Sequence, residues 1–305
     1  MTRQHYVPQF YLKNFSILNR EDFIYAYKRN KKIIFTNIKN VAVEKNFYTF
    51  KNKITGEKIN DIDYALTLLE GEVAPLIKKL TKTNYLKLTN GEKTLLSCFI
   101  SFLHLKNLSS KERLKNAYLE MTKQVLTISA QNREFFKKHI KNAGIKIGGE
   151  KEIEESRKFF LEKKYELYSD DDSYFIVKSL ALAQHIAPLI FFKEWNILES
   201  DSSRVFVTSD NPVSLIRPKD LPQIYGVGFI NGLISIQISP KRCLFLKNEK
   251  SSKNITRVNR KYVDFINRHT AFYSYRYIYS NIKSRDIQNM FNETVEGEGE
   301  KFLIS

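Results

Sequence analysis

The apolar residues of this chain change their spacing twice between its two ends. Near the N-terminus, apolar and polar residues alternate on both sides of the turn sequence KRNKK, which predicts a hairpin of Phe23–Lys28 against Lys32–Asn37. From residue 61, apolar residues recur every three or four positions, as in a helix. Short β-branched and aromatic runs return in the last third. This order predicts an α+β fold, with a helical middle region packed on a mixed or antiparallel sheet built from N- and C-terminal strands.

The middle region has four segments with helical spacing. They cover 61–80, about 89–107 with Thr89 or Asn90 as the cap, 109–131, and Ser173–Trp195 with a kink or boundary at Pro188. The charged sequence between the last two is broken by GIKIGGE, which indicates a loop or insertion near 136–166, with a helix after the break. Because hydrophobic residues make up 42% of the 305 residues, we expect one domain over 1–305 with a real core.

The strands of the last third lie around two turns. The sequence SRVFVTSDNPVSLI predicts a strand, a turn and an extended run, and two more strands flank Ser239-Pro240. A helix over NITRVNRKYVDFINRHTAFYSYR (254–276), with Val258, Val263 and Ile266 on its buried side, and a final strand over Ala271–Tyr279 complete the pattern, and a short strand is expected near Phe47–Phe50. If both β regions form one sheet, the N-terminus lies beside Thr208–Pro212.

The chain is strongly basic, with a formal net charge of +17. Such an excess attracts polyanions, nucleic acid first. A lysine-rich composition from AT-biased codons explains the same excess, so both interpretations stay open. Cys98 and Cys243 lie far apart in apolar runs, which is typical of buried free thiols in a reducing compartment. With no signal peptide and no apolar run of membrane-spanning length, we expect a soluble cytoplasmic protein.

Two short polar sequences stand out as candidate sites. The first, TSDNP, follows the predicted strand RVFV, where a rigid strand aims side chains such as Ser209, Asp210 and Asn211. The same residues are also common in turns, where they bond their own backbone. The second holds His5 and Gln9 at the N-terminus, where a histidine is often merely exposed.

Several motifs that mark particular classes of enzyme are absent from the sequence. The sequence has no Walker P-loop and no GxGxxG, so nucleotide-dependent motor or redox chemistry has no support. The five histidines show no HxH or HExxH spacing, which argues against a dedicated zinc site. Arg257 and Arg260 in RVNRK are candidate phosphate contacts, although a solvated helix face is an equally good interpretation.

The order HYVPQFYLKNFS, a lone tryptophan, TSDNPV, ISPKRCLFL and VNR resembles a widespread microbial family of uncharacterised proteins. That family has an N-terminal His-Tyr-Val-Pro-Gln motif and a later Ser-Asp-Asn-Pro motif. Its members resemble accessory genes of bacteria and phages, which suggests defence or toxin-like roles. The resemblance further implies that Glu70 is a usual helical acidic position. It also implies that Lys106 stands where arginine is frequent, so this chain keeps the charge and loses the bidentate fork.

Convergence of these signature residues predicts a nuclease, a phosphodiester hydrolase acting on RNA or single-stranded nucleic acid. His5 acts as general acid or base, Asp210 orients it or holds Mg²⁺ or Mn²⁺ together with Glu70, and Gln9 and Asn211 stabilise the charged phosphate. The predicted substrate-binding residues are Lys106, Ser209, Arg257 and Arg260.

The alternative is a non-catalytic protein that binds nucleic acid or regulates a partner. In that case His5 bonds the TSDNP turn, and the signature residues form a structural clasp.

Overall fold

The computed structural model describes residues 3–51, 58–59, 61–146, 148–169, 173–250 and 254–294. The chain forms two compact units. The first, here called the sheet unit, is Met1–Ser110 with Ile176–Ser305, and the second, the hairpin unit, is Lys111–Phe175. Strands at both ends of the chain and helices in the middle confirm the α+β prediction. Whether the chain is one domain with an insertion stays a prediction.

Strands from both ends of the chain meet in a four-stranded antiparallel sheet of order β3-β2-β13-β8 within the described residues. Its strands are β2 (Phe23–Tyr27), β3 (Ile34–Asn37), β8 (Thr208–Ser209) and β13 (Ile278–Ser280). The predicted N-terminal hairpin is confirmed, because β2 and β3 pair in antiparallel register. This sheet brings Thr208–Ser209 into the same layer as the N-terminal hairpin.

C-terminal strands form a second sheet of order β12-β7-β11-β10-β9, in which β12 runs parallel to β7 and the other pairs are antiparallel. Its strands are β7 (Glu194–Ser200), β9 (Val213–Ile216), β10 (Leu233–Ser239), β11 (Arg242–Lys247) and β12 (Ile255–Val258). The strands predicted around Ser239-Pro240 are confirmed as β10 and β11. The two β regions therefore share one sheet only in part.

Three strand predictions and one helix prediction need correction. Residues 204–207 are not a strand, and β8 begins only at Thr208. The helix expected over 254–276 covers only Arg260–Tyr273, because Ile255–Val258 pair with β7 as strand β12. The final strand begins at Ile278 rather than Ala271, because this helix continues to Tyr273. Near Phe47–Phe50, the strands are β4 (Val43–Lys45) and β5 (Phe50–Lys51), with β6 (Lys58–Ile59) pairing to β5, while residues between β4 and β5 form a turn.

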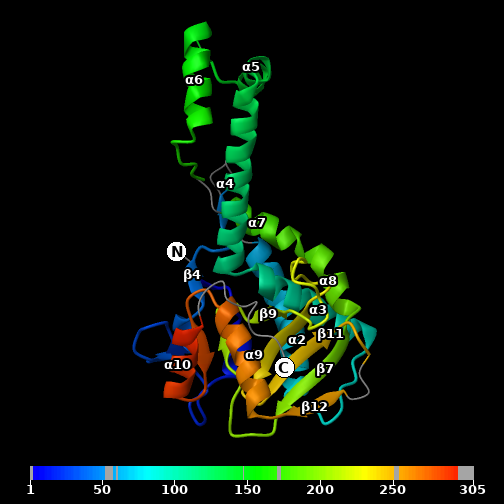
Figure 1. Ribbon diagram of the computed structural model, residues 1–305. Coiled ribbons are helices and arrows are strands. Elements are labelled where there is room, and N and C mark those ends of the chain that lie inside the picture. Colours follow the sequence, from blue (N-terminus) through cyan, green and yellow to red (C-terminus); the bar gives the residue numbers. More distant parts are fainter. Residues whose placement is uncertain are drawn as a thin grey trace. The chain divides into compact units, whose positions relative to one another are not determined.

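The N-terminal segment is built into the fold rather than frayed. Strand β1 (Arg3–His5) pairs with β4, and His5 lies opposite Val43 (Figure 1). Helix α1 (Gln9–Lys13) follows directly, with Pro8 at its N-cap as expected of proline near a first turn. The segment buries four apolar side chains completely, Val7, Tyr11, Leu12 and Phe15. Burial on that scale stabilises it by several kcal/mol, at about 2 kcal/mol per large side chain.

Helices cover the sheets of the first unit. They are α2 (Asp61–Leu80), α3 (Asn90–Leu105), α8 (Ala183–Phe191), α9 (Arg260–Tyr273) and α10 (Arg285–Glu293), and the 3-10 helix η1 (Ile38–Asn40) lies after β3. Helix α3 packs against both α2 and α8, so it is central as its all-round apolar sequence predicts. Thr89 forms the predicted cap and shares a capping box with Glu92.

The expected helix over Ser173–Trp195 is wrong in its boundaries. The structure divides it at Leu182 into α7 (Ser173–Ala181) and α8, Pro188 lies inside α8, and Trp195 already belongs to β7. Within the described residues, Tyr174–Phe191 is long and apolar enough to cross a membrane by length and composition, contrary to the expectation that no run has this length. It is 39% buried inside the protein, and core helices of soluble proteins have the same properties.

The hairpin unit consists of helices. Most of α4 (Leu108–Gln131), together with α5 (Arg133–Asn142) and α6 (Glu150–Glu162), belongs to it (Figure 1). The predicted break in GIKIGGE lies between α5 and α6, where Gly149 takes a positive φ of 48° that glycine adopts readily. The helix expected after this break is confirmed as α6, whereas the part before the break is helix α5 rather than a loop.

Candidate active site

Gln4 and His5 share the first strand but have different surroundings. Gln4 is buried, accepts the Tyr48 N–H at 2.7 Å and donates to the Thr49 hydroxyl at 3.3 Å. These bonds hold β1 against the segment after β4. His5 is only half-buried and lines a pocket. Both residues line this pocket, so they differ in burial and in hydrogen bonding rather than in the pocket that they face.

The pocket has a volume of about 410 Å³, and we call it the N-terminal pocket. Four residues singled out from the sequence line it together: His5, Gln9, Glu70 and Lys106. They come from β1, α1, α2 and the end of α3. Further wall residues, which the sequence did not distinguish, are Arg3, Gln4, Phe10, Tyr48, Asp63, Leu66, Thr67, Gly71 and Ala74. The fold thus brings together groups up to about 100 positions apart in the sequence.

Lys106 presents a positive charge to the pocket from a buried position. It caps the C-terminus of α3, where a cation is favoured by the helix dipole. Its side chain is 1% exposed, and its ammonium donates to the carboxylate of Glu70, which is a quarter exposed. Tyr48 donates its hydroxyl to the Lys106 carbonyl at 3.0 Å and fixes the backbone there. A buried charge is costly without a partner, so Glu70 is what allows Lys106 to lie here.

His5 is held in a state that suits proton transfer. Burial lowers the pKa of its imidazole, a hydrogen bond with the Val41 backbone opposes that shift, and the charges of Arg3 and Lys106 lower the pKa further. The ring is therefore neutral at pH 7. Its Nδ1 atom is buried and has no hydrogen-bond partner among the described residues. A neutral imidazole that is half-buried at the wall of a pocket can act as a general base.

Asp210 does not line the N-terminal pocket. It is 1% exposed, and its carboxylate accepts three backbone N–H bonds, from Tyr275 at 2.8 Å, Arg276 at 2.7 Å and Tyr277 at 3.0 Å. Burial raises the pKa of this carboxyl to about 6, although the three N–H donors and Arg276 pull it the other way. Every oxygen of the group is thus occupied by the turn that precedes β13.

Asn211 completes the same arrangement from the next position. Its amide donates to the Tyr273 carbonyl at 2.8 Å, and its oxygen accepts from the Asn107 amide at 3.0 Å. Ser209 accepts the Asn211 N–H at 3.1 Å, which is the turn chemistry that the sequence allowed as an alternative. We call Ser209–Asn211 with residues 273–277 the clasp.

The clasp is connected to the pocket through the chain neighbours of two pocket residues. Asn107, which follows Lys106, bonds Asn211 and also accepts the Ser110 N–H at 2.9 Å at the start of α4. Tyr6 follows His5, and burial together with the nearby charge of Asp210 raises the pKa of its hydroxyl. The clasp therefore positions the backbone on both sides of the pocket. Neither Tyr6 nor Asn107 was distinguished by the sequence, since single polar or aromatic residues carry no spacing signal.

Tyr11 provides a further connection that the sequence did not reveal. It is fully buried on α1, and its hydroxyl lies 2.8 Å from the Thr208 hydroxyl and donates to the Gln237 carbonyl at 2.6 Å. This pair of bonds joins the N-terminal segment to β8 and β10. The N-terminus is thus fixed to the residues just before the clasp by Tyr11 rather than by His5.

The two arginines predicted to bind substrate lie elsewhere. Arg257 is 81% exposed on β12 and lies 3.8 Å from Glu199, and Arg260 on α9 approaches Asp264 at 3.7 Å. Arg257 lines a separate pocket of about 350 Å³ with Lys247 and Tyr262. Neither arginine lines the N-terminal pocket, so their role in substrate binding stays a prediction.

A divalent metal does not fit the two predicted ligands jointly. Glu70 bonds the Lys106 ammonium, and both oxygens of Asp210 accept backbone N–H groups, which leaves no shared position for a cation. Across the described ranges, no cluster of three or more His, Cys, Asp or Glu side chains has a geometry that could hold a metal ion. A site for Mg²⁺ or Mn²⁺ therefore stays a prediction and enters no step below.

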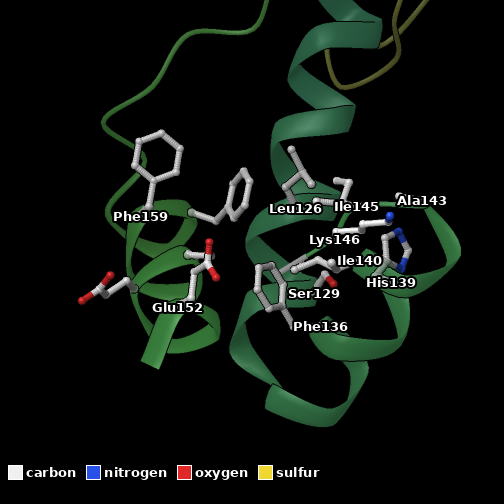
Figure 2. A pocket seen from close by; sticks show the side chains of 13 residues that line it. Leu126, Ser129, Phe136, His139, Ile140, Ala143, Ile145, Lys146, Glu152 and Phe159 are labelled. Carbon is white, nitrogen blue, oxygen red and sulfur yellow. The ribbon is translucent and has the colours of Figure 1, made fainter. Parts of the chain in front are cut away.

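A larger pocket of about 500 Å³ lies within the hairpin unit, and Figure 2 shows its side chains. Its walls are mainly apolar, with Phe136 and Ile140 of α5 near Leu126 of α4 and Phe159 of α6. The polar groups at this pocket include His139 and Lys146, both exposed. Such a lining supplies little for catalysis, so the N-terminal pocket is the better candidate.

Comparison with known proteins gives one match. Residues 3–284 match the family described as "Protein of unknown function (DUF4238)". No curated protein and no solved structure matches the chain. The match includes β1, the pocket residues and the clasp, and it covers nearly the whole chain. The chain therefore belongs to the DUF4238 family, as its resemblance to an uncharacterised family implied.

Proposed function

We propose that the N-terminal pocket binds a phosphodiester of RNA or single-stranded nucleic acid and hydrolyses it. The observation that carries the proposal is the pairing of two groups in one pocket. His5 is a neutral, half-buried imidazole at the pocket wall, and Lys106 is a buried cation that lines the same pocket. A base and a fixed positive charge are what attack on a phosphate diester requires.

The proposed reaction uses water as the nucleophile. His5 takes a proton from water as the water oxygen bonds to phosphorus, and the bond from phosphorus to the leaving oxygen breaks. The leaving oxygen takes up a proton from solvent, so the products are an alcohol and a phosphate monoester. Lys106 and the Gln9 amide bind the non-bridging oxygens, whose charge grows in the transition state. Glu70 holds the ammonium in place between turnovers.

The net charge agrees with a polyanionic substrate but does not single one out. Residues 111–175 carry fourteen Lys and Arg and twelve Asp and Glu, so most of the net charge of +17 belongs to the sheet unit, which contains the pocket. The sheet unit has 240 of the 305 residues, so its share of the charge is close to its share of the chain, and a lysine-rich composition explains the division equally well.

The test is cleavage of RNA, single-stranded DNA and duplex DNA by the purified protein, in EDTA and in Mg²⁺ or Mn²⁺. We expect cleavage of a single-stranded polymer that persists in EDTA. His5→Gln should abolish it, whereas His185→Gln, the same change at an exposed histidine of α8, should leave it intact.

Two results would count against the proposal. Salt-sensitive binding without turnover would reduce the protein to a nucleic-acid-binding one. Absence of both cleavage and binding would refute the proposal. AT-biased codon usage would then be the explanation of the net positive charge.

A further inference from the structure

Helix α4 carries an apolar stripe that the described residues of the hairpin unit leave largely exposed. The stripe consists of Leu114, Tyr118, Met121, Val125 and Ile128. Leu114 is half-buried, while the other four are exposed by 50%, 64%, 48% and 60% respectively. Tyr118 packs one edge against Phe175 and is still half exposed. Single exposed apolar residues are ordinary, but five in register along one helix are not.

The spacing of the stripe is that of a coiled-coil seam. Successive members are four, three, four and three positions apart, an average of 3.5 residues. This is the period that keeps a seam facing a second helix, with Tyr118 and Val125 at a positions and Leu114, Met121 and Ile128 at d positions. A face that packs on a sheet or an irregular surface has no reason to keep this period.

The opposite side of α4 is already used within the hairpin unit. Ala130 is completely buried, and Arg157 of α6 donates to its carbonyl at 3.0 Å. Leu126 contributes to the apolar pocket with Phe136. Because Leu126 and Ala130 contact α5 and α6 and lie outside the stripe positions, the stripe is a separate second face.

The residues beside the stripe favour a second copy of this chain as the partner. The e and g positions are occupied by Ala117, Gln124 and Gln131 on one side and by Lys115, Thr122 and Ser129 on the other. With one charge among six, identical helices meet without like-charge repulsion. The hairpin unit as a whole is close to neutral, whereas the strongly basic sheet units of two copies repel each other.

We propose that two copies of the chain pair through this stripe as antiparallel α4 helices. In this arrangement a positions pack beside d positions of the other copy, so Val125 lies beside Met121 and Tyr118 lies beside Ile128. A large residue then lies beside a smaller one at each outer layer, whereas a parallel pair places two tyrosines together. The interface is isologous, as in most soluble dimers.

The first test is the solution mass of the full chain, measured by light scattering at concentrations up to about 100 µM, where a Kd in the micromolar range gives mainly dimer. We expect twice the 35.9 kDa chain mass for the wild type and for Glu120→Lys, which changes an exposed charge of α4 off the stripe. Met121→Lys and Val125→Glu should be monomeric with unchanged helix content, because both positions are exposed in one copy.

A wild-type monomer at this concentration would overturn the proposal, and so would a dimer that persists in both stripe variants. The first result would mean that the stripe packs on the sheet unit or on a different molecule.

The antiparallel orientation of the two α4 helices is tested by disulfide cross-linking of single-cysteine variants in a Cys98→Ser background, under mild oxidation. Met121→Cys should cross-link to Val125→Cys of the other copy. Tyr118→Cys should cross-link only when Ile128→Cys is present, since bridged Cα atoms must lie within about 7 Å. Efficient self-cross-linking of Tyr118→Cys would contradict the antiparallel arrangement.

Discussion

The clasp and the N-terminal pocket hold the two halves of the same signature, and they differ in how their polar atoms are satisfied. In the clasp, Asp210 accepts three N–H bonds, and the Asn211 amide both donates and accepts. In the pocket, one nitrogen of His5 has no partner among the described residues, and Glu70 is a quarter exposed.

This difference in hydrogen bonding distinguishes the residues that stabilise the fold from the residues that are available for catalysis. A buried polar group with all its partners stabilises one conformation and has nothing left to offer a substrate. A group that lines a pocket and is partly exposed is available for a ligand. The structural interpretation of the signature residues therefore applies to the clasp, and the catalytic interpretation applies to the N-terminal pocket. The clasp residues are positioning residues, and the pocket residues are the candidates for catalysis.

The largest expected effect is on cleavage by the pocket variant His5→Gln. The rate should fall by about 10²–10⁴-fold, which is the usual contribution of a general base. The unfolding temperature should change little, because His5 is only half-buried. Rate and melting temperature, measured on the same preparation, check this. The wild-type rate should also fall at acid pH with a midpoint below 6.5, since burial lowers the pKa of His5; a midpoint above 7 would exclude His5 as the base.

Asp210→Ala should show the opposite pattern. Three buried N–H groups lose their acceptor, and the free energy of unfolding should fall by about 3 kcal/mol or more, at 1–3 kcal/mol for each unsatisfied group with partial relief from water. Urea denaturation measures the loss. The control is Asp220→Ala on an exposed loop, which should change stability by less than about 0.5 kcal/mol. Equal stability of the two variants would mean that the clasp is not structural.

The clasp should also show its own pH dependence. The pKa of Asp210 is about 6 in the folded protein and near 3.8 in the unfolded chain. Between these values the folded state binds the proton more tightly, so stability rises as pH falls from 7 to 4, by up to about 3 kcal/mol from this group. Asp210→Asn should lack this rise. The difference in melting temperature between wild type and variant, followed from pH 7 to 4, tests the sign, and a difference that shrinks toward pH 4 would contradict it.

The smallest effect concerns Lys106→Met. Replacing a buried ion pair by an apolar side chain of similar size is often neutral for stability, and Glu70 can regain water at its exposed edge. Substrate affinity should nevertheless fall by about 10-fold, as for the loss of one charged contact to phosphate. Equilibrium binding to a single-stranded oligonucleotide measures the change. A variant that loses stability while keeping affinity would move Lys106 into the clasp group.

The sequence predicts the fold best where periodic spacing is long. The helices over 61–80 and 90–105 and the hairpin of β2 and β3 follow from their patterns. The sequence does not predict where some helices and strands begin and end. The run from Ser173 is apolar throughout, so no change of pattern marks the break at Leu182. The RVFV residues have strand composition but lie outside the hydrogen-bonded ladders, which only tertiary pairing decides.

The sequence predicts which residues belong to the candidate site. It does not predict which of them line the N-terminal pocket and which lie in the clasp. Residue type and resemblance identify His5, Gln9, Glu70, Lys106 and Asp210 as a group. They do not tell which carboxylate accepts backbone N–H groups and which lines a pocket, because that depends on the turn at 275–277. Asn107 and Tyr11, which connect the two regions, were missed because each acts through one long-range bond with no pattern around it.

The most direct test is the cleavage rate per folded molecule, measured side by side for His5→Gln and Asp210→Asn at a temperature where both are folded. Asp210→Asn should keep a rate within about 10-fold of the wild type, since it acts only by positioning, whereas His5→Gln should lose at least about 100-fold. The reverse order, with folded Asp210→Asn inactive and His5→Gln active, would place the chemistry in the clasp and contradict the division proposed here.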